Sequence, residues 1–180
     1  MNTAKTLRMA IFFAYSAICL LTRLLPFRPL QTSLILAMQM PMSRQWGCSV
    51  GFVFGFINMV SFDLITGHVG WWTLTTAISY GALAYLTRIC INTTSATRYL
   101  YAALVATLGY DILTGIILGP WLFGQSLFVT CMGQIPFTIM HLIANATFSS
   151  LLGTYLETVM QKEVVVSPSL RKEQKSWQMI

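Results

Sequence analysis

The sequence predicts an all-α integral membrane protein, a bundle of six transmembrane helices with both termini in the cytoplasm. Three observations support this class. Of the 180 residues, 56% are hydrophobic, and only 9% are charged. Apolar runs of helical length also recur along most of the chain. Soluble domains carry roughly a quarter charged residues, so a surface this apolar fits a bilayer better than water.

The composition also excludes several classes of function. The net charge of +6 comes from basic residues spread over short loops and the C-terminal tail, so we expect no nucleic-acid partner. The cysteines are far apart without a CxxC pair, and histidines are few, so neither a disulfide framework nor a metal site is predicted. No nucleophile elbow, HExxH motif or phosphate-binding loop occurs. We therefore expect no enzyme and no cofactor.

The first predicted helix runs from about Leu7 to Leu25. Basic residues precede it as in a signal peptide, but the apolar run meets Arg23 instead of a small-residue cleavage site, so we expect the helix to be retained. Ala10, Ala14 and Ala17 follow one another at helical spacing. Such a flat ridge lets another helix approach closely, either inside the bundle or from a partner.

The second helix is predicted to be short, tilted or broken, because prolines bracket the apolar segment Pro29–Pro41. A dozen residues rise only about 20 Å, which is less than the ~30 Å hydrocarbon core. Its polar residues favour a position inside protein. The third helix is predicted from about Gln45 to Ile65, and Gly47, Gly51 and Gly55 give it a close-packing face.

A unit that occurs twice organises the middle of the chain. The first copy reads Asp63-Leu64-Ile65-Thr66-Gly67 and continues to Gly70-Trp71-Trp72, and the second reads Asp111-Ile112-Leu113-Thr114-Gly115 and continues to Gly119-Pro120-Trp121. The fourth helix is predicted over 71–89 and the fifth over 98–118. Each copy closes an apolar run, so we expect a helix to end and a Gly-rich turn to begin at both. The repetition suggests an architectural unit used twice, with a site between the copies.

The chain after the second copy leaves two topologies open. If 121–132 were a separate span, the tail would lie opposite the N-terminus; we prefer a loop or re-entrant piece, because glycines and glutamines interrupt the run. The last helix then runs from about Ile135 to Met160, with Pro136 in a favoured first-turn position. Its polar stripe, which we expect to face the bundle interior, comprises Gln134, Thr138, His141, Asn145, Ser149 and Gly153.

The distribution of charge predicts the orientation. We expect one transmembrane substrate-binding domain over 1–161 and a polar cytoplasmic tail over 162–180. With six helices, nine basic residues share the side of the termini, and only Arg23 and Arg28 lie opposite. By the positive-inside rule the first side is cytoplasmic, so both repeated units face outward from a bacterial cytoplasmic (inner) membrane, which the protein crosses several times.

Two aspartates on neighbouring helices also permit an intramembrane aspartyl enzyme, in which paired acids share a proton. Tyr110-Asp111 matches half of that signature. The other half is missing, because Asp63 follows Ser61-Phe62 where Gly-x-Gly would be needed. This enzyme is therefore the last of the hypotheses.

What remains is an outward-facing pocket, floored by the polar stripe and rimmed by turns that carry tryptophans. Such a pocket suits a planar, moderately polar small molecule, because its rings can stack on Trp while a few polar groups set its orientation. An aromatic belt for the tryptophans and helix-end structure for the acids stay open as alternatives. The predicted substrate-binding residues are Asp63, Trp71, Trp72, Asp111, Trp121, Gln125, His141, Asn145 and Arg28.

Taken together, these features resemble the S component, the substrate-binding membrane subunit, of energy-coupling factor (ECF) transporters. The resemblance covers roughly residues 5–160 and rests on the six helices, the alanine ridge, the 63–72 motif, and Pro136-Phe137 with His141 and Asn145. It implies a vitamin-like or heterocyclic micronutrient bound at the outer side. It also implies a transmembrane coupling protein, on which the alanine ridge docks, and two cytoplasmic ATPases.

The alternative is a non-catalytic structural membrane protein of cell-envelope assembly, similar to the rod-shape MreD proteins. In that case the repeated unit would serve packing only. The sequence leaves the substrate open, because no set of its residues matches one named vitamin.

Overall fold

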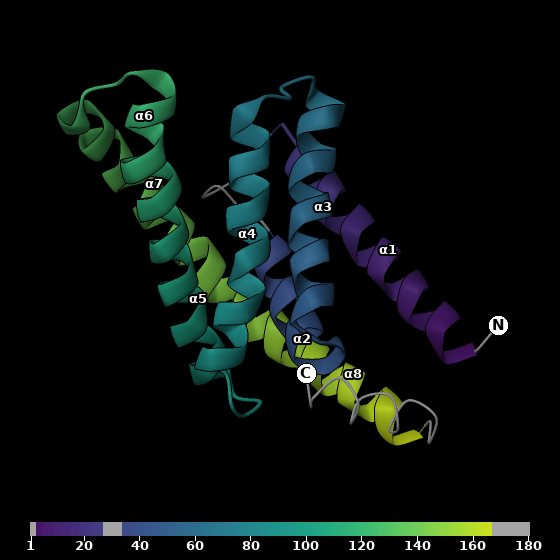
Figure 1. Cartoon of the computed structure of the whole chain (residues 1–180). Coiled ribbons are helices and arrows are strands. Elements are labelled where there is room, and N and C mark those ends of the chain that lie inside the picture. The colour runs from purple at the N-terminus through teal and green to yellow at the C-terminus, as the bar shows by residue number, and fades with distance from the viewer. Residues whose placement is uncertain (1–2, 27–33, 167–180) are drawn as a thin grey trace.

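The computed structural model describes residues 3–26 and 34–166, and within these ranges every regular element is a helix. Figure 1 shows α3 and α4 as one antiparallel pair and α5 and α7 as a second, with the α3–α4 and α6–α7 turns at the same end of the bundle. The elements are α1 (Thr3–Leu24), α2 (Ile35–Trp46), α3 (Cys48–Thr66), α4 (Trp71–Cys90), α5 (Ala96–Asp111), η2 (Ile112–Leu118), α6 (Gly119–Phe123), α7 (Leu127–Phe148), η3 (Ser149–Gly153) and α8 (Thr154–Val166), where η2 and η3 are π-helical.

Four helical segments are long and apolar enough to cross a membrane: 5–24, 48–66, 96–123 and 127–161. Their outward faces carry large hydrophobic side chains such as Phe13, Ile57, Leu108 and Ile139, which are all exposed. Exposed apolar surface on every long helix is what a bilayer requires and what water disfavours. The prediction of a helical membrane protein is confirmed at this level.

The short helix α2 lies inside the bundle, as predicted. Every one of its residues except Arg44 is buried. Gln39 Nε2 donates to the main-chain oxygens of Gly51 at 3.1 Å and Tyr80 at 3.0 Å, so α2 is hydrogen-bonded to both α3 and α4. Gly47, with φ 103°, is the single residue that joins α2 to α3. The third helix therefore starts at Cys48, and the expected start at Gln45 falls inside α2.

The glycine face predicted for the third helix is present at two of its three positions. A Cβ on Gly51 would overlap Ser43, and a Cβ on Gly55 would lie 2.7 Å from Gln39 Nε2. Both glycines therefore let α2 approach α3 closely. Gly47 has open space around its Cβ position and serves the link between the two helices instead.

The two repeated units differ in structure, and the prediction that both end a helix is wrong for the second. In the first copy, α3 ends at Thr66, and Gly67 (φ 73°) donates its N–H to the Asp63 main-chain oxygen. In the second copy the chain stays helical through η2 and α6, and the left-handed glycine is Gly124 (φ 64°). Pro120 stands in the first turn of α6, where its missing N–H is tolerated.

Residues 121–132 do not form a separate span, and the loop expected there is confined to residues 124–126. Trp121–Phe123 complete one long helix, and α7 begins at Leu127 with Ser126 Oγ accepting from the Val129 N–H. The expected start near Ile135 is wrong, because Pro136 lies inside α7. Isolated glycines cost a helix only about 1 kcal/mol, and a bilayer makes open main-chain groups far more costly. The last helix also continues past the expected boundary at Gln161, to Val166.

The polar stripe of the last helix faces the bundle interior, as predicted. His141, Asn145, Ser149 and Gly153 are buried, and Gln134 and Thr138 are half-buried. Gly153 has a packing role, since a Cβ there would lie 2.8 Å from the Tyr99 ring.

Candidate ligand-binding site

A cavity of about 510 Å³ lies at the end of the bundle that holds the α3–α4 turn. Its volume falls in the range of about 300–1,000 Å³ that small-molecule sites occupy. Helices α1, α3, α4, α5, η2 and α7 contribute to its wall. The lining residues are Arg23, Met59, Phe62, Asp63, Thr66, His68, Trp72, Thr76, Tyr110, Thr114, Gly115, Gln134 and Phe137.

Both repeated units and the polar stripe meet at this cavity. The first unit supplies Asp63, Thr66 and Trp72, and the second supplies Thr114 and Gly115. Gln134, the first residue of the stripe, packs against Gly115 so closely that a Cβ on the glycine would overlap its amide. Parts of both repeated units and the first residue of the stripe thus share one cavity wall, whereas Asp111 and the stripe residues His141 and Asn145 do not line it.

The turn between α3 and α4 decides which tryptophan enters the cavity. Gly70 N–H donates to Thr73 Oγ1 at 3.1 Å and Thr73 N–H to the Gly70 oxygen at 3.1 Å, which fixes the start of α4. Trp72 then lines the cavity and packs on Phe123, with ring centroids 5.3 Å apart. Its neighbour Trp71 points outward and is 81% exposed. Consecutive helical residues differ by about 100° in direction, so only one of the two can face inward.

A buried acid–histidine pair lies behind the cavity wall. Asp111 Oδ1 is 2.8 Å from His141 Nδ1, and both side chains are buried. An ionised carboxylate only accepts hydrogen bonds, so in the ionised form of the pair Nδ1–H is the donor. The Tyr110 and Phe137 rings, which line the cavity, pack on the imidazole at centroid distances of 6.1 and 5.4 Å. The pair therefore supports two aromatic side chains of the wall.

One turn further along α7, a second polar pair bridges the same two helices. Asn145 Nδ2 donates to Thr107 Oγ1 at 2.9 Å, and both side chains are buried. Together with the acid–histidine pair it ties α5 to α7 below the cavity. Neither pair contributes to the cavity lining.

Two side chains of opposite charge line the cavity, and they differ in their contacts with the rest of the protein. The Arg23 guanidinium stacks on Phe62, 4.1 Å from the ring centroid, and its Nη1 is 2.7 Å from Met59 Sδ. The half-buried Asp63 carboxylate accepts no hydrogen bond and joins no ion pair among the described residues. The positive charge is thus engaged by the protein, and the negative charge lines the cavity with no partner within residues 3–26 and 34–166.

The structure places the predicted substrate-binding residues in three groups. Asp63 and Trp72 line the cavity, and Asp111, His141 and Asn145 lie buried behind it. Trp71, Trp121 (79% exposed) and Gln125 lie on the outside of the bundle. Arg28 lies outside the described residues. Ala10, Ala14 and Ala17 are exposed along α1, which packs mainly on α3.

Sequence reasoning did not select several residues that line the cavity. Thr114 lies on the same face of its helix as Thr107 and Asp111, and this spacing of three and four residues could have indicated it. Phe137 follows Pro136 and precedes His141 by one turn, so the polar stripe could have indicated it too. Thr66 holds in the first repeated unit the position of Thr114 in the second, so the repeat could have indicated it, whereas Thr76 gave no such signal.

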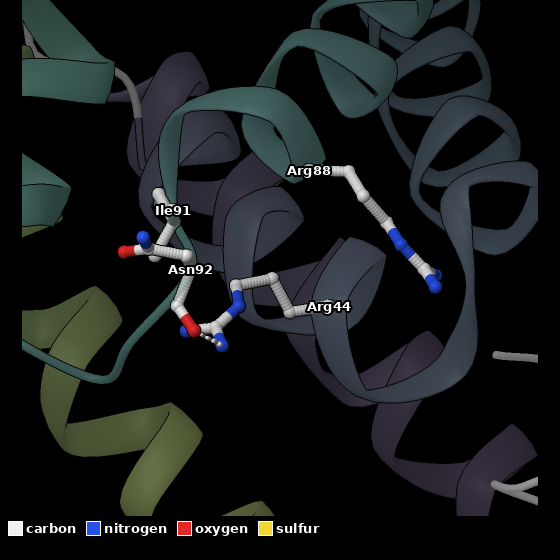
Figure 2. Close-up of a pocket in the computed structure, with 4 residues that line it drawn as sticks. All are labelled: Arg44, Arg88, Ile91 and Asn92. Atoms are coloured by element: carbon white, nitrogen blue, oxygen red, sulfur yellow. Dashed lines mark hydrogen bonds between the residues drawn. The ribbon is translucent and has the colours of Figure 1, made fainter.

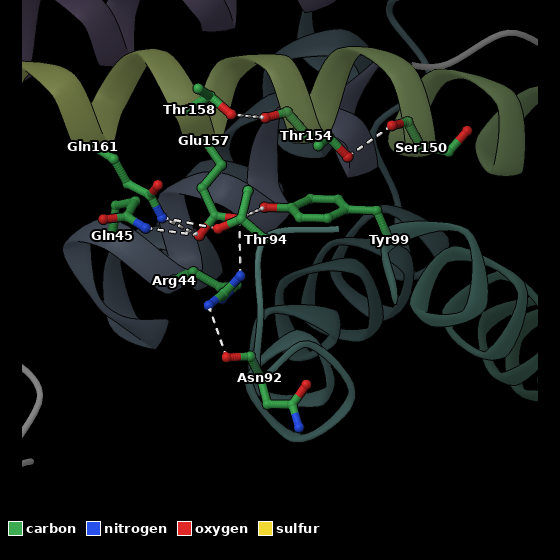
Figure 3. A network of polar contacts seen from close by, with 10 residues as sticks. All are labelled: Arg44, Gln45, Asn92, Thr94, Tyr99, Ser150, Thr154, Glu157, Thr158 and Gln161. Atoms are coloured by element: carbon green, nitrogen blue, oxygen red, sulfur yellow. Dashed lines mark hydrogen bonds and ion pairs between the residues drawn. The ribbon is translucent and has the colours of Figure 1, made fainter. Parts of the chain in front are cut away.

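The opposite end of the bundle holds a closed polar cluster around Glu157, which is 0% exposed. Its carboxylate accepts hydrogen bonds from Arg44 Nη1 at 2.8 Å, Gln45 Nε2 at 2.7 Å and the Tyr99 hydroxyl at 2.9 Å (Figure 3). Gln161 Nε2 bridges the same carboxylate, at 3.4 Å, to Thr94 Oγ1 at 2.9 Å. The cluster joins α8 to α2 and to the start of α5. Sequence analysis missed Glu157 and Gln161, although they continue the stripe beyond Gly153 at steps of four.

A smaller pocket of about 240 Å³ adjoins this cluster and is lined by Arg44, Arg88, Ile91 and Asn92. Figure 2 shows the Arg44 guanidinium lying against Asn92, while Arg88 extends away on the other side. Arg44 Nη2 donates to the Asn92 main-chain oxygen at 3.4 Å, so this arginine is held at both ends of its guanidinium. The pocket therefore belongs to the structural framework of that end.

The large cavity combines aromatic rings, a few polar groups and a carboxylate that has no partner among the described residues, which are features common in small-molecule sites. Within the described residues, no group of three or more His, Cys, Asp or Glu side chains lies close enough together to hold a metal ion. Comparison of the chain with protein-family models, with curated proteins and with solved structures finds no match.

Proposed function

We propose that this chain is the membrane-embedded substrate-capture subunit of an ECF-type uptake transporter, without catalysis of its own. Its substrate would be a small vitamin-like or heterocyclic micronutrient. The observation that supports this best is the convergence of both repeated units and the polar stripe on one cavity of about 510 Å³. A packing role alone would not call for a space of that size between them.

The chemistry of the wall suits a planar ligand. Phe62, Trp72, Tyr110 and Phe137 supply aromatic faces, and each stacked ring pair contributes about 0.5–1.5 kcal/mol beyond its area burial. The threonines and Gln134 supply polar atoms that fix orientation. Because the Asp111–His141 pair holds Tyr110 and Phe137 in place, the wall is formed before the ligand arrives, which lowers the entropic cost of binding.

The proposed topology has six membrane crossings with both termini cytoplasmic and the cavity on the outer side. The count of basic residues favours this orientation, with nine on the side of the termini and Arg23 and Arg28 opposite. Helix α4 has 20 residues and reaches about 30 Å, enough to cross. Helix α2, with 12 residues, reaches only about 18 Å, which is less than the ~30 Å hydrocarbon core.

Transport would draw its energy from partners. The exposed ridge of Ala10, Ala14 and Ala17 on α1 is the surface proposed to dock on a transmembrane coupling protein, which two cytoplasmic ATPases drive. Small residues suit such a contact, because helices without bulky side chains pack closely in lipid. The membrane in question would be the cytoplasmic membrane of a bacterium.

Mass spectrometry of the purified protein tests the proposal. We expect a small aromatic or heterocyclic compound to co-purify with the wild type and to be lost from Trp72→Ala. Trp121→Ala is the matched control, since Trp121 belongs to the other repeated unit but lies outside the cavity, and it should retain the compound. A protein that is always empty, and whose melting temperature does not change across vitamins and nucleobases, would contradict the proposal.

A further inference from the structure

We propose that the cavity selects a planar ligand rich in N–H donors, such as an amino-substituted or protonated nitrogen heterocycle. It disfavours ligands that present carbonyl or carboxylate oxygens. This inference rests on the proposed function, because it concerns the ligand of the same cavity. It follows from which polar atoms of the cavity wall can still donate a hydrogen bond and which can still accept one.

The hydroxyl protons of three threonines of the wall are already used in hydrogen bonds within their own helices. Thr66, Thr76 and Thr114 each donate the hydroxyl to the main-chain oxygen four residues earlier, at 2.9, 2.9 and 2.7 Å. A hydroxyl has one proton and two lone pairs, so each can only accept a further hydrogen bond. These residues come from α3, α4 and η2, so acceptors stand on three sides of the cavity.

The Asp63 carboxylate adds the strongest acceptor. Neither of its oxygens receives a hydrogen bond from a described residue, although the Asp63 main-chain oxygen accepts from Gly67 and His68. Removing a carboxylate from water without a partner is unfavourable, and a ligand that supplies N–H groups relieves this penalty. A ligand carboxylate would instead be repelled by it.

The donors of the wall are neutral or already engaged by other side chains. The Arg23 guanidinium is stacked on Phe62 and lies against Met59 Sδ. Gln134 donates one amide proton to Thr138 Oγ1 at 3.2 Å. The indole N–H of Trp72 and the Tyr110 hydroxyl are neutral donors, and His68 is exposed at the rim. Among the described lining residues, Arg23 is the cationic donor, and its guanidinium is already engaged by Phe62 and Met59, whereas the Asp63 carboxylate has no such contact.

The aromatic residues favour the same class of ligand. The faces of Phe62, Trp72, Tyr110 and Phe137 carry the negative side of the ring quadrupole, which attracts cations and electron-poor rings. A flat heterocycle with amino groups satisfies the rings through its faces and the acceptors through its edges. Neutral or anionic rings whose edges carry carbonyl oxygens can stack on the aromatic residues, but those oxygens cannot donate to the acceptors of the wall.

A matched pair of probes tests the inference on the full chain in lipid nanodiscs. The probes 2,4-diaminopyrimidine and uracil have the same ring size and substitution pattern. The first presents four N–H donors on two amino groups and no carbonyl oxygen, and the second presents two ring N–H donors and two carbonyl oxygens. We expect the diaminopyrimidine to bind at least tenfold more tightly by isothermal titration calorimetry. Benzoate, a planar anion, should not bind.

Two variants locate the selectivity. Asp63→Asn keeps the shape and removes the charge, and should weaken diaminopyrimidine binding at least tenfold. Thr76→Val removes an acceptor of the wall and should weaken it severalfold. Thr75→Val is the control, because Thr75 makes the same bond to its own helix, to the Trp71 oxygen at 2.9 Å, but does not line the cavity.

The outcomes separate this inference from the proposed function. Tighter binding of uracil or benzoate, or an Asp63→Asn variant as tight as wild type, would overturn the inference and leave ligand capture standing. If neither pyrimidine binds but a compound co-purifies, its chemistry decides: a donor-rich edge supports the inference and an acceptor-rich edge overturns it. No binding of either probe and no co-purified compound would overturn both proposals.

Discussion

The two ends of this bundle differ in how fully a carboxylate is hydrogen-bonded. At one end, Glu157 is fully buried and accepts hydrogen bonds from Arg44, Gln45 and Tyr99 at 2.7–2.9 Å. At the other, Asp63 lies on the wall of a cavity of about 510 Å³ and has no such partner among the described residues. A saturated buried charge fixes the positions of the helices around it, because any other arrangement leaves it unpaired. A carboxylate without such partners can still accept hydrogen bonds from a bound ligand.

The largest effect we predict is on stability, at the saturated end. Glu157→Ala leaves the Arg44 guanidinium, which is 15% exposed, without its carboxylate. Removing one member of a buried pair costs about 3–5 kcal/mol, so the melting temperature in detergent should drop strongly. Thr158→Ala is the control, since this exposed neighbour bonds only to its own helix. A Glu157→Ala protein as stable as the control would show that the cluster is not structural.

A double variant sharpens the same comparison. Arg44→Met with Glu157→Leu removes both charges and replaces them with apolar side chains of similar size. Such exchanges are often neutral or stabilising, so we expect the double variant to recover most of the lost melting temperature. A double variant less stable than Glu157→Ala alone would mean that Arg44 stabilises this end by some route other than the ion pair.

An intermediate effect is predicted behind the cavity. Asp111→Asn weakens the contact with His141 and should cost about 1–3 kcal/mol, because a buried polar pair is disturbed. Ligand affinity should fall as well, since Tyr110 and Phe137 lose part of their support. Thermal unfolding and titration calorimetry on the same preparation measure both quantities. A loss of affinity as large as that of Asp63→Asn would place Asp111 in contact with the ligand.

The smallest effect on stability is predicted at the unsaturated end. Asp63→Asn removes no hydrogen bond of the described structure and should change the free energy of unfolding by less than about 0.5 kcal/mol. Chemical denaturation in mixed micelles measures this. A larger change in either direction would contradict the prediction, and a clear destabilisation would reveal that Asp63 supports the end of α3.

The membrane class, the buried position of α2 and the inward face of the polar stripe could all be predicted from sequence. Each depends on composition or periodicity. These are averaged over many residues, so a misplaced helix end does not change the prediction. The ends of the helices were less predictable. Gly115, Gly119 and Gly133 lie in helices where a turn was expected, because Gln134 packs on Gly115 and because the bilayer penalises open main-chain groups.

The site was predictable only in outline. The sequence indicated that the repeated units would meet, but it did not show that Trp72 would face inward and Trp71 outward, since that depends on the phase at which α4 begins. It also gave no sign that Thr66 and Thr76 would share one cavity wall, because they belong to different helices. Glu157 continues the spacing of the polar stripe, but its partners Arg44, Gln45 and Tyr99 lie far away in the sequence, so the cluster could not be predicted.

The most direct test measures the melting temperature of Glu157→Gln and Asp63→Asn, each with and without the compound that co-purifies with the wild type. We predict that Glu157→Gln melts well below wild type but still gains the full ligand-induced increase, whereas Asp63→Asn melts near wild type and gains little or none. The account would be contradicted if Asp63→Asn kept the full increase while Glu157→Gln lost it, because the functional and structural ends would then be the reverse of those described.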